Sequence, residues 1–171
     1  MKSASLLLAI SLAASHGIAV AQQDDEHHRG HDMEQMHEQH GEHGSGHAMR
    51  MGRPGDAHNV SRTVSITMDD SMRYAPDNIS IKSGETVRFF IKNNGAMMHE
   101  MVLGSMDELK EHARMMRDMP DMQHNAPHMA RIKPGKRGAI IWHFDKPGTI
   151  QFGCMVPGHL EGGMVGTITV Q

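Results

Sequence analysis

The chain has 171 residues, among them 18 Met, 15 His and a single Cys. Lys and Arg number 17 against 20 Asp and Glu, and a formal net charge of -3 argues against a broad basic surface for nucleic acid. The single Cys excludes an intramolecular disulfide and any metal site made of Cys alone. Imidazole and thioether groups are ligands that suit copper, so their surplus favours a copper-binding protein. The alternative is that Met fills a core and His lies on the surface.

Residues 1–21 have the pattern of a secretory signal. Lys2 supplies a positive start, Leu6–Ala14 is an apolar run too short to span a bilayer, and Ala19-Val20-Ala21 matches an A-x-A cleavage pattern. We predict cleavage after Ala21, no membrane span afterwards, and export to the periplasm of a Gram-negative source.

Residues 22–58 form a polar, biased segment. It holds eight His and four Met but no Val, Ile, Leu or aromatic residue, so it cannot bury enough apolar surface to offset the entropy of ordering. Close spacing of imidazoles, as in His37-x2-His40-x2-His43, favours the binding of additional copper. A solubilising tail with incidental His is the alternative. We predict a disordered, metal-binding tail.

Residues 59–171 have the pattern of an all-β domain. Apolar residues alternate with polar ones in short runs, which predicts half-buried strands. The expected strands lie at residues 64–68, 79–81, 87–91, 99–103, 140–144, 150–154 and 165–170. Strands this short, separated by turns, predict a β-sandwich of seven to eight strands.

A single helical insert interrupts this rhythm. Ser105 and Glu108 form an S-x-x-E capping box. Leu109, Ala113 and Met116 then recur at helical spacing, and Pro120 ends the run. We predict a helix of about three turns, followed by a loop over residues 121–131.

The C-terminal segment carries the clearest chemical motif. Cys154, His159 and Met164 follow a C-x4-H-x4-M spacing, with Pro-Gly and Gly-Gly turns between them. His99, at the head of a predicted strand, is the candidate second imidazole. Two His, one Cys and a weak axial Met form the ligand set of blue copper sites, which transfer electrons. Because protein fills every position, this metal offers no open site for catalysis.

Residues from about 60 to 171 resemble the cupredoxins, and among them the exported copper-tolerance cupredoxins. The resemblance rests on Met97–Gly104, Glu108–Lys110, Pro134–Lys136 and Cys154–Met164. It implies a Greek-key β-sandwich and one type 1 copper. The copper ligands that it implies are His99, Cys154, His159 and Met164.

The chain also departs from the better-known cupredoxins. Plastocyanins have a shorter gap between the Cys and the His, and azurins a shorter gap between that His and the Met. Glu100 follows the first His, where those proteins usually have an Asn that ties the ligand loops together. The surroundings of the copper are therefore expected to differ from theirs.

The remaining methionines form two further groups. Met97, Met98 and Met101 surround His99, and we expect Met101 to pack in the core. Met115, Met119 and Met122 lie near His124 and His128. These five side chains predict either a surface Cu(I) site or irregular packing by flexible Met.

Two functions are consistent with these features. The first is copper tolerance, with a redox-active type 1 site and a His/Met-rich tail that binds extra copper. The alternative is a soluble electron carrier, docking through an apolar rim of Met155, Val156, Pro157 and Leu160 around His159. A copper oxidase or nitrite reductase is disfavoured because the folded part has no H-x-H pair. We predict that the protein is a monomer and not an enzyme. Its predicted partners are copper ions and a periplasmic cytochrome, copper exporter or oxidase.

Overall fold

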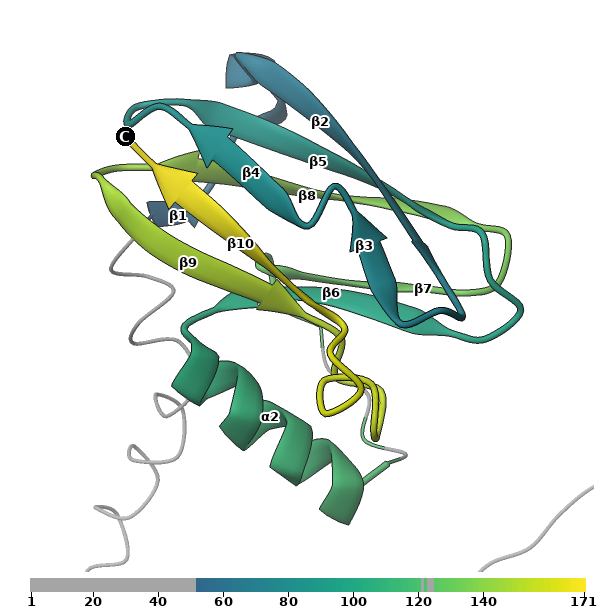
Figure 1. The fold of residues 1–171 in the computed structure, drawn as a ribbon. Coiled ribbons are helices and arrows are strands. Elements are labelled where there is room, and N and C mark those ends of the chain that lie inside the picture. Colours follow the sequence, from purple (N-terminus) through teal and green to yellow (C-terminus); the bar gives the residue numbers. More distant parts are fainter. Residues whose placement is uncertain (1–51, 121, 123–124) are drawn as a thin grey trace, which may run out of the picture. The chain divides into compact units, whose positions relative to one another are not determined.

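The computed structural model describes residues 52–120, 122 and 125–171, so the predicted signal and most of the predicted tail lie outside the described residues. Within them, two five-stranded sheets face each other, with one α-helix beside them (Figure 1). The elements in chain order are β1 (Gly52–Pro54), the 3-10 turn η1 (Ala57–Asn59), β2 (Arg62–Asp69), β3 (Arg73–Ala75), β4 (Asn78–Ile81), β5 (Thr86–Asn93), β6 (His99–Gly104), α2 (Met106–Asp118), β7 (Met129–Ile132), β8 (Arg137–Phe144), β9 (Gly148–Gly153) and β10 (Val165–Val170).

The strand order confirms the predicted sandwich. The first sheet runs β1-β8-β5-β2-β3 and the second runs β4-β10-β9-β6-β7. β2 pairs in parallel with β5, and β4 pairs in parallel with β10, whereas the other described pairs are antiparallel. From β3 to β6 each successive strand lies in the opposite sheet, and this crossing produces the Greek-key arrangement.

The core lies between the two sheets and follows the strand alternation. On β5, Val87, Phe89 and Ile91 are fully buried, while Phe90 between them is exposed. Tyr74 and Phe152 come from opposite sheets, and their rings meet edge to face with centroids 4.9 Å apart. Each buried side chain of this size stabilises the fold by about 1.5–3 kcal/mol.

The helix α2 forms as its capping signature predicts. The Ser105 hydroxyl accepts the N–H of Glu108, and the Glu108 carboxylate accepts the N–H of Ser105 at 2.8 Å. Leu109, Ala113 and Met116 are buried. Figure 1 shows the helix beside the second sheet, and these three side chains form a second apolar cluster, which also contains residues of β6, β7 and the segment after β9. The predicted insert is therefore confirmed.

Three strands of the structure were not expected from the pattern. β1, β3 and β7 all lie at sheet edges. They span at most four residues, too few for an alternating pattern to be recognisable. β7 falls partly within the residues expected to form a loop. The described fold also begins before residue 59, since Gly52 is buried and pairs with Phe144 of β8.

One end of the sandwich collects the segments that carry the candidate ligands. β2 and β5 run in parallel and end together, because Met68 pairs with Asn93. The turn after β5 leads into His99 at the start of β6, and the loop from Cys154 to Met164 joins β9 to β10. No described helix is both long and apolar enough to cross a membrane.

Candidate metal centre

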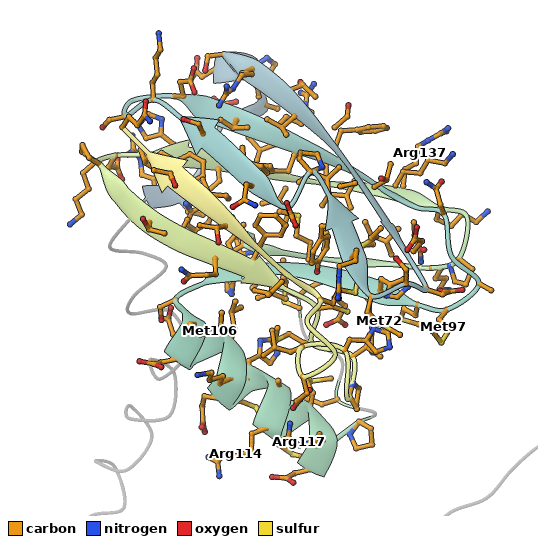
Figure 2. The ribbon with its side chains drawn as sticks, viewed as in Figure 1. Met72, Met97, Met106, Arg114, Arg117 and Arg137 are labelled. Carbon is orange, nitrogen blue, oxygen red and sulfur yellow. The ribbon has the colours of Figure 1, made fainter. Side chains whose placement is uncertain are left out.

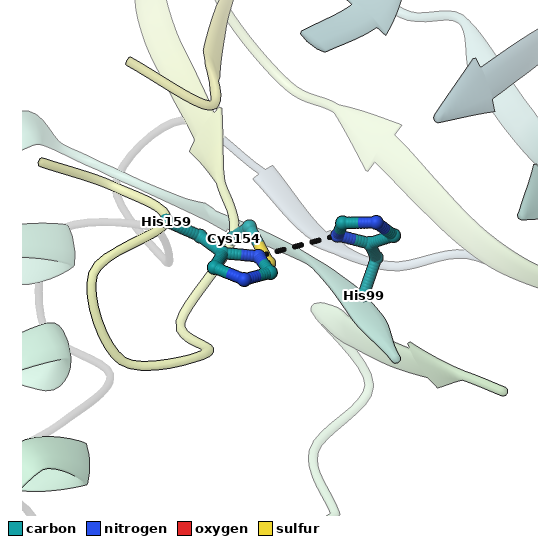
Figure 3. A group of neighbouring side chains, drawn as sticks. All are labelled: His99, Cys154 and His159. Atoms are coloured by element: carbon teal, nitrogen blue, oxygen red, sulfur yellow. Dashed lines mark hydrogen bonds between the residues drawn. The ribbon is translucent and has the colours of Figure 1, made fainter. Parts of the chain in front are cut away.

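Three of the four predicted ligands meet in the structure. His99 comes from the start of β6, and Cys154 and His159 come from the loop after β9 (Figure 3). One ligand atom from each lies within 4.8 Å of the others, and all three side chains are buried. The Nδ1 atoms of the two imidazoles lie 3.2 Å apart, and the Cys154 Sγ lies 3.4 Å from the His159 Nδ1.

The hydrogen bonds show which nitrogen of His99 is available for a metal. His99 Nε2 lies 3.1 Å from the Asp70 Oδ1. Backbone N–H groups and the bond from His99 lower the pKa of the Asp70 carboxyl, so it is ionised and only accepts. The His99 Nε2 therefore carries the proton, and the Nδ1 lone pair points toward Cys154 and His159. Metal-binding imidazoles are oriented in this way by a carboxylate.

Burial controls the protonation of the other two groups. It raises the pKa of the Cys154 thiol to about 11, although backbone N–H groups of Glu100 and Val156 oppose the rise. Burial, followed by repulsion from His99, lowers the pKa of His159. The centre therefore holds a neutral imidazole and a thiol at neutral pH, and a cation that binds there displaces the thiol proton. Two imidazoles and a sulfur that becomes a thiolate fit copper.

The loop from Cys154 to Met164 is closed by its own backbone. The Cys154 N–H donates to the Met164 carbonyl at 3.1 Å, and the Met164 N–H donates to the His159 carbonyl at 2.9 Å. Gly158 and Gly163 have φ angles of 85° and 86°, which glycine adopts readily. Met164 is fully buried at the end of this loop. Its role as the axial ligand stays a prediction.

The turn that leads into His99 is held by side chains from elsewhere. The Asp70 carboxylate accepts the N–H groups of Ala96 at 2.7 Å and Met97 at 3.2 Å. Asn93, fully buried, donates to the carbonyls of Met97 at 2.7 Å and Ile132 at 3.0 Å. Its Oδ1 accepts the Gly95 N–H at 2.8 Å. Sequence analysis did not identify Asp70 or Asn93, because neither belongs to a motif with the ligands.

Glu100 occupies the position after the first His, where an Asn usually links the ligand segments. Its backbone N–H donates to the Cys154 Sγ at 3.3 Å, and this bond ties the two ligand segments together. Its side chain is buried and forms an ion pair with the Arg131 Nε at 2.8 Å, while Tyr74 donates to its carbonyl. The connection is therefore made by backbone, and the Glu100 carboxylate lies against β7 instead.

The other predicted groups have different outcomes. Met155 is fully buried beneath α2, so it does not belong to the apolar rim around His159; Val156 and Leu160 are half-buried, and Pro157 is exposed. Met101 lies in the core as expected. Met115 and Met119 are exposed and Met122 is half-buried, whereas His124 lies outside the described residues. The His128 ring packs on Trp142, at a centroid distance of 6.4 Å. A copper site on this segment stays a prediction.

Comparison with known proteins points to the same chemistry. Residues 58–171 match the family described as copper binding proteins, plastocyanin/azurin family. The copper-resistant cuproprotein CopI of Rubrivivax gelatinosus is 50% identical over 120 residues, which cover 70% of this chain and 73% of that protein. The protein of the same name from Pseudomonas aeruginosa is 32% identical over 154 residues, covering 73% of this chain and 84% of the other.

Solved structures of similar fold include the auracyanins. Auracyanin B matches with a TM-score of 0.60 and 23% identity, over 71% of this chain and 96% of that chain. The dithionite-reduced auracyanin of Roseiflexus castenholzii matches with a TM-score of 0.57 and 24% identity, over 66% of this chain and 98% of that chain. At this identity, the likeness concerns the fold.

Proposed function

The chain belongs to the plastocyanin/azurin family of copper-binding proteins, and from that membership we propose that it is an exported copper-tolerance protein. The observation that carries the proposal is the meeting of two buried imidazoles and one buried thiol within 4.8 Å. Relatives named for copper resistance, 50% and 32% identical, support the physiological role. His99, Cys154 and His159 would hold the metal, with Met164 as the axial ligand.

Each part of the centre contributes to holding copper. When bound, copper supplies one-electron chemistry by changing between Cu(I) and Cu(II). Cys154 provides the soft thiolate, while Asp70 orients His99. The bonded loop from Cys154 to Met164 keeps the ligands in one arrangement, and such a loop favours fast electron transfer because little has to move. The burial of His99 and Cys154 excludes water from the metal.

Export and the His/Met-rich tail complete the proposed role. The signal pattern over residues 1–21 favours the periplasm, the compartment in which the protein would encounter incoming copper. The imidazoles and thioethers between residues 22 and 51 are suited to bind further copper ions. We infer that the tail gathers copper while the folded domain holds one ion tightly. With all coordination positions filled by protein, the centre has no place for a substrate, so the protein is not an enzyme.

Growth on copper tests the physiological role. Deleting the gene in the source organism should lower the copper concentration that the cells tolerate. The wild-type gene should restore growth, whereas a gene carrying Cys154→Ser should restore it poorly. Unchanged growth of the deletion strain on high copper would contradict copper tolerance.

Metal counting tests the division between tail and domain. The mature chain and a chain lacking residues 22–51 should each show one coloured copper, and the longer chain should bind additional colourless copper. Equal copper content in the two chains would contradict a metal-binding tail. The cut stops at residue 51 because Gly52 belongs to the first sheet.

One observation favours electron transfer as a second candidate function. His159 is 7% exposed, whereas His99 and Cys154 are fully buried. The His159 ring is therefore the route from the metal to a partner, bordered by Val156, Pro157 and Leu160. Fast reduction of the copper-loaded protein by a periplasmic cytochrome would support this role. Slow reduction by every such cytochrome, together with copper-sensitive growth of the deletion strain, would support copper tolerance and contradict electron transfer.

A further inference from the structure

Exposed thioether groups are few in the described part of the chain, and one lies beside the metal centre. The exposed large apolar side chains among the described residues are Phe90, Met97, Met115 and Met119. Met115 lies on the exposed side of α2, and Met119 follows the last residue of that helix. Met97 is 42% exposed and lies two residues before His99. It is therefore the exposed sulfur next to a candidate ligand.

Met72 has an unusual backbone conformation close to the same centre. Its φ of 61° makes it the one non-glycine residue with a positive φ in the described part of the chain. That conformation costs about 1–2 kcal/mol for a residue with a Cβ, and Gly or Asn adopts it more easily. A Cβ added to Gly162, in the loop that carries His159, would lie 3.7 Å from the Met72 Cγ. A Met in this costly conformation, with its side chain close to the ligand loop, points to a use for the side chain.

Hydrogen bonds link the two methionine-bearing turns to the ligand-bearing segments. Asp70 accepts both the Met97 N–H at 3.2 Å and the His99 Nε2–H at 3.1 Å. The Arg73 guanidinium donates to the Met72 carbonyl at 2.8 Å and to the Gly162 carbonyl at 3.1 Å. Figure 2 shows the Met72 and Met97 side chains at the same end of the sandwich. Both sulfurs are thereby carried on turns fixed to the centre.

Access to the centre makes this placement meaningful. His99 and Cys154 are fully buried, and His159, at 7% exposed, is the group through which the centre reaches the surface. A copper ion therefore enters beside the His159 loop, near which the Met72 side chain lies. Thioethers are neutral, soft ligands that select Cu(I), and Met side chains are flexible enough to follow an ion.

We propose that Met72 and Met97 form a thioether port, a transient site that receives Cu(I) and passes it to His159 and Cys154. The proposal rests on the copper role proposed above. During transfer, bonds from the Met sulfurs to Cu(I) break, and bonds to the Cys154 Sγ and the imidazole Nδ1 atoms form. The thiol proton passes to water. Copper stays Cu(I), so the step needs no oxidant or reductant.

The alternative is that both side chains serve only packing. Met72 is half-buried and also packs against the main core cluster. Leucine has nearly the same volume and lacks the sulfur, so Met→Leu preserves packing and tests the thioether alone. The test variant is the mature chain with both Met72→Leu and Met97→Leu. Met106→Leu, which removes a half-buried thioether at the start of α2 and outside the predicted copper sites, is the matched control.

The experiment measures how fast Cu(I) reaches Cys154. Metal-free mature protein is mixed without oxygen with Cu(I) held by bicinchoninate, and samples are oxidised with ferricyanide at intervals. The thiolate-to-copper(II) absorption then reports only metal bound at Cys154, whatever the tail has taken up. The double variant should load about tenfold more slowly, the lower end of the effect of changing residues around a metal's ligands. Its final absorbance and reduction potential should equal those of the wild type, and Met106→Leu should load at the wild-type rate.

Several results would overturn the port. One is wild-type loading by the double variant, and another is equal slowing by Met106→Leu. An altered affinity at an unchanged rate would place the two methionines in the final site instead. If the wild-type chain itself never develops the absorption, the proposed copper centre fails and the port fails with it. If the wild-type chain develops the absorption and both variants load at the wild-type rate, only the port fails.

Discussion

The two segments that supply the ligands are held in place in different ways. The loop from Cys154 to Met164 is closed by hydrogen bonds within its own backbone, with Gly158 and Gly163 at the positive φ angles of its turns. The turn before His99 depends on the side chains of Asp70, which follows β2, and Asn93, the last residue of β5, where the turn begins. One ligand segment is therefore largely self-supporting, with Arg73 adding hydrogen bonds to the Gly162 and Gly163 carbonyls, and the other is fixed by its neighbours.

This difference explains which substitutions should matter in each segment. In the self-supporting loop the bonds come from backbone groups, so exposed side chains that do not bind metal are expected to be replaceable. In the supported turn single side chains make several bonds, so a substitution far from His99 in sequence should still disturb it.

The largest effect should come from the ligand sulfur in the self-supporting loop. Cys154→Ser replaces a soft thiolate with a hard hydroxyl, which binds Cu(I) poorly. The intense thiolate-to-copper(II) absorption should disappear, and the affinity for Cu(I) should fall by more than about a hundredfold, beyond the range of residues around a metal's ligands. Absorption spectra and competition with a Cu(I) chelator measure both. Val156→Ala, in the same loop, should keep the absorption; its loss there, or its survival in Cys154→Ser, would contradict the assignment.

A smaller effect should follow from the proton on the same sulfur. With a Cys154 pKa of about 11 and a His159 pKa below its usual value, the metal-free centre carries one proton that copper displaces at neutral pH. Because binding releases a proton, the apparent affinity of the centre should rise with pH, about tenfold per unit from about pH 7 to 9. Competition titrations across this range, on the chain lacking residues 22–51, measure the slope. A flat profile would show that the sulfur is already ionised in the metal-free protein.

The same contrast decides how much of the centre could be predicted from sequence. Cys154, His159 and Met164 lie within one short segment with turn-forming glycines, so spacing and residue type were enough to propose them together. His99 could be proposed because it lies at the head of a predicted strand. Asp70 and Arg131 could not, because only the strand pairing brings them beside the ligands, and Asn93 could not, because no motif links it to His99. The role of Glu100 could not be predicted either, since its backbone rather than its side chain bonds the Cys154 sulfur.

The fold shows the corresponding division. The seven strands with clear alternation and the capped helix were predicted, because their signals lie within a few residues. The edge strands β1, β3 and β7 were missed, because each is short and pairs with one neighbour only. Gly52 illustrates the point: a Cβ at this position would lie 2.7 Å from the Trp142 Nε1. Its place in the sheet depends on its pairing with Phe144 of β8, some ninety residues away in the sequence.

Unfolding measurements compare the supports of the two segments. Asn93→Ala removes three hydrogen bonds from the supported turn and leaves buried carbonyls without their donors. At about 1–3 kcal/mol for each buried group left unsatisfied, the free energy of unfolding should fall by about 2–4 kcal/mol. Urea unfolding of the metal-free protein measures the change. Pro157→Ala, exposed in the self-supporting loop, should stay within about 0.5 kcal/mol of the wild type; similar losses in both variants would remove the contrast.

The smallest predicted effect concerns the charge that supports His99. Asp70→Asn keeps an oxygen to accept the His99 Nε2–H but removes a negative charge, and that charge stabilises Cu(II) more than Cu(I). The reduction potential should therefore rise, by up to about 59 mV, the equivalent of a tenfold change in a one-electron equilibrium. Asp145→Asn removes the same charge after the end of β8, opposite the start of β5 and thus at the other end of the sandwich. A redox titration should find that control unchanged. Equal shifts in both variants would mean that the reduction potential responds only to the overall charge of the protein. A shift confined to Asp70→Asn would show that Asp70, which holds the turn before His99, also tunes the reduction potential of the metal.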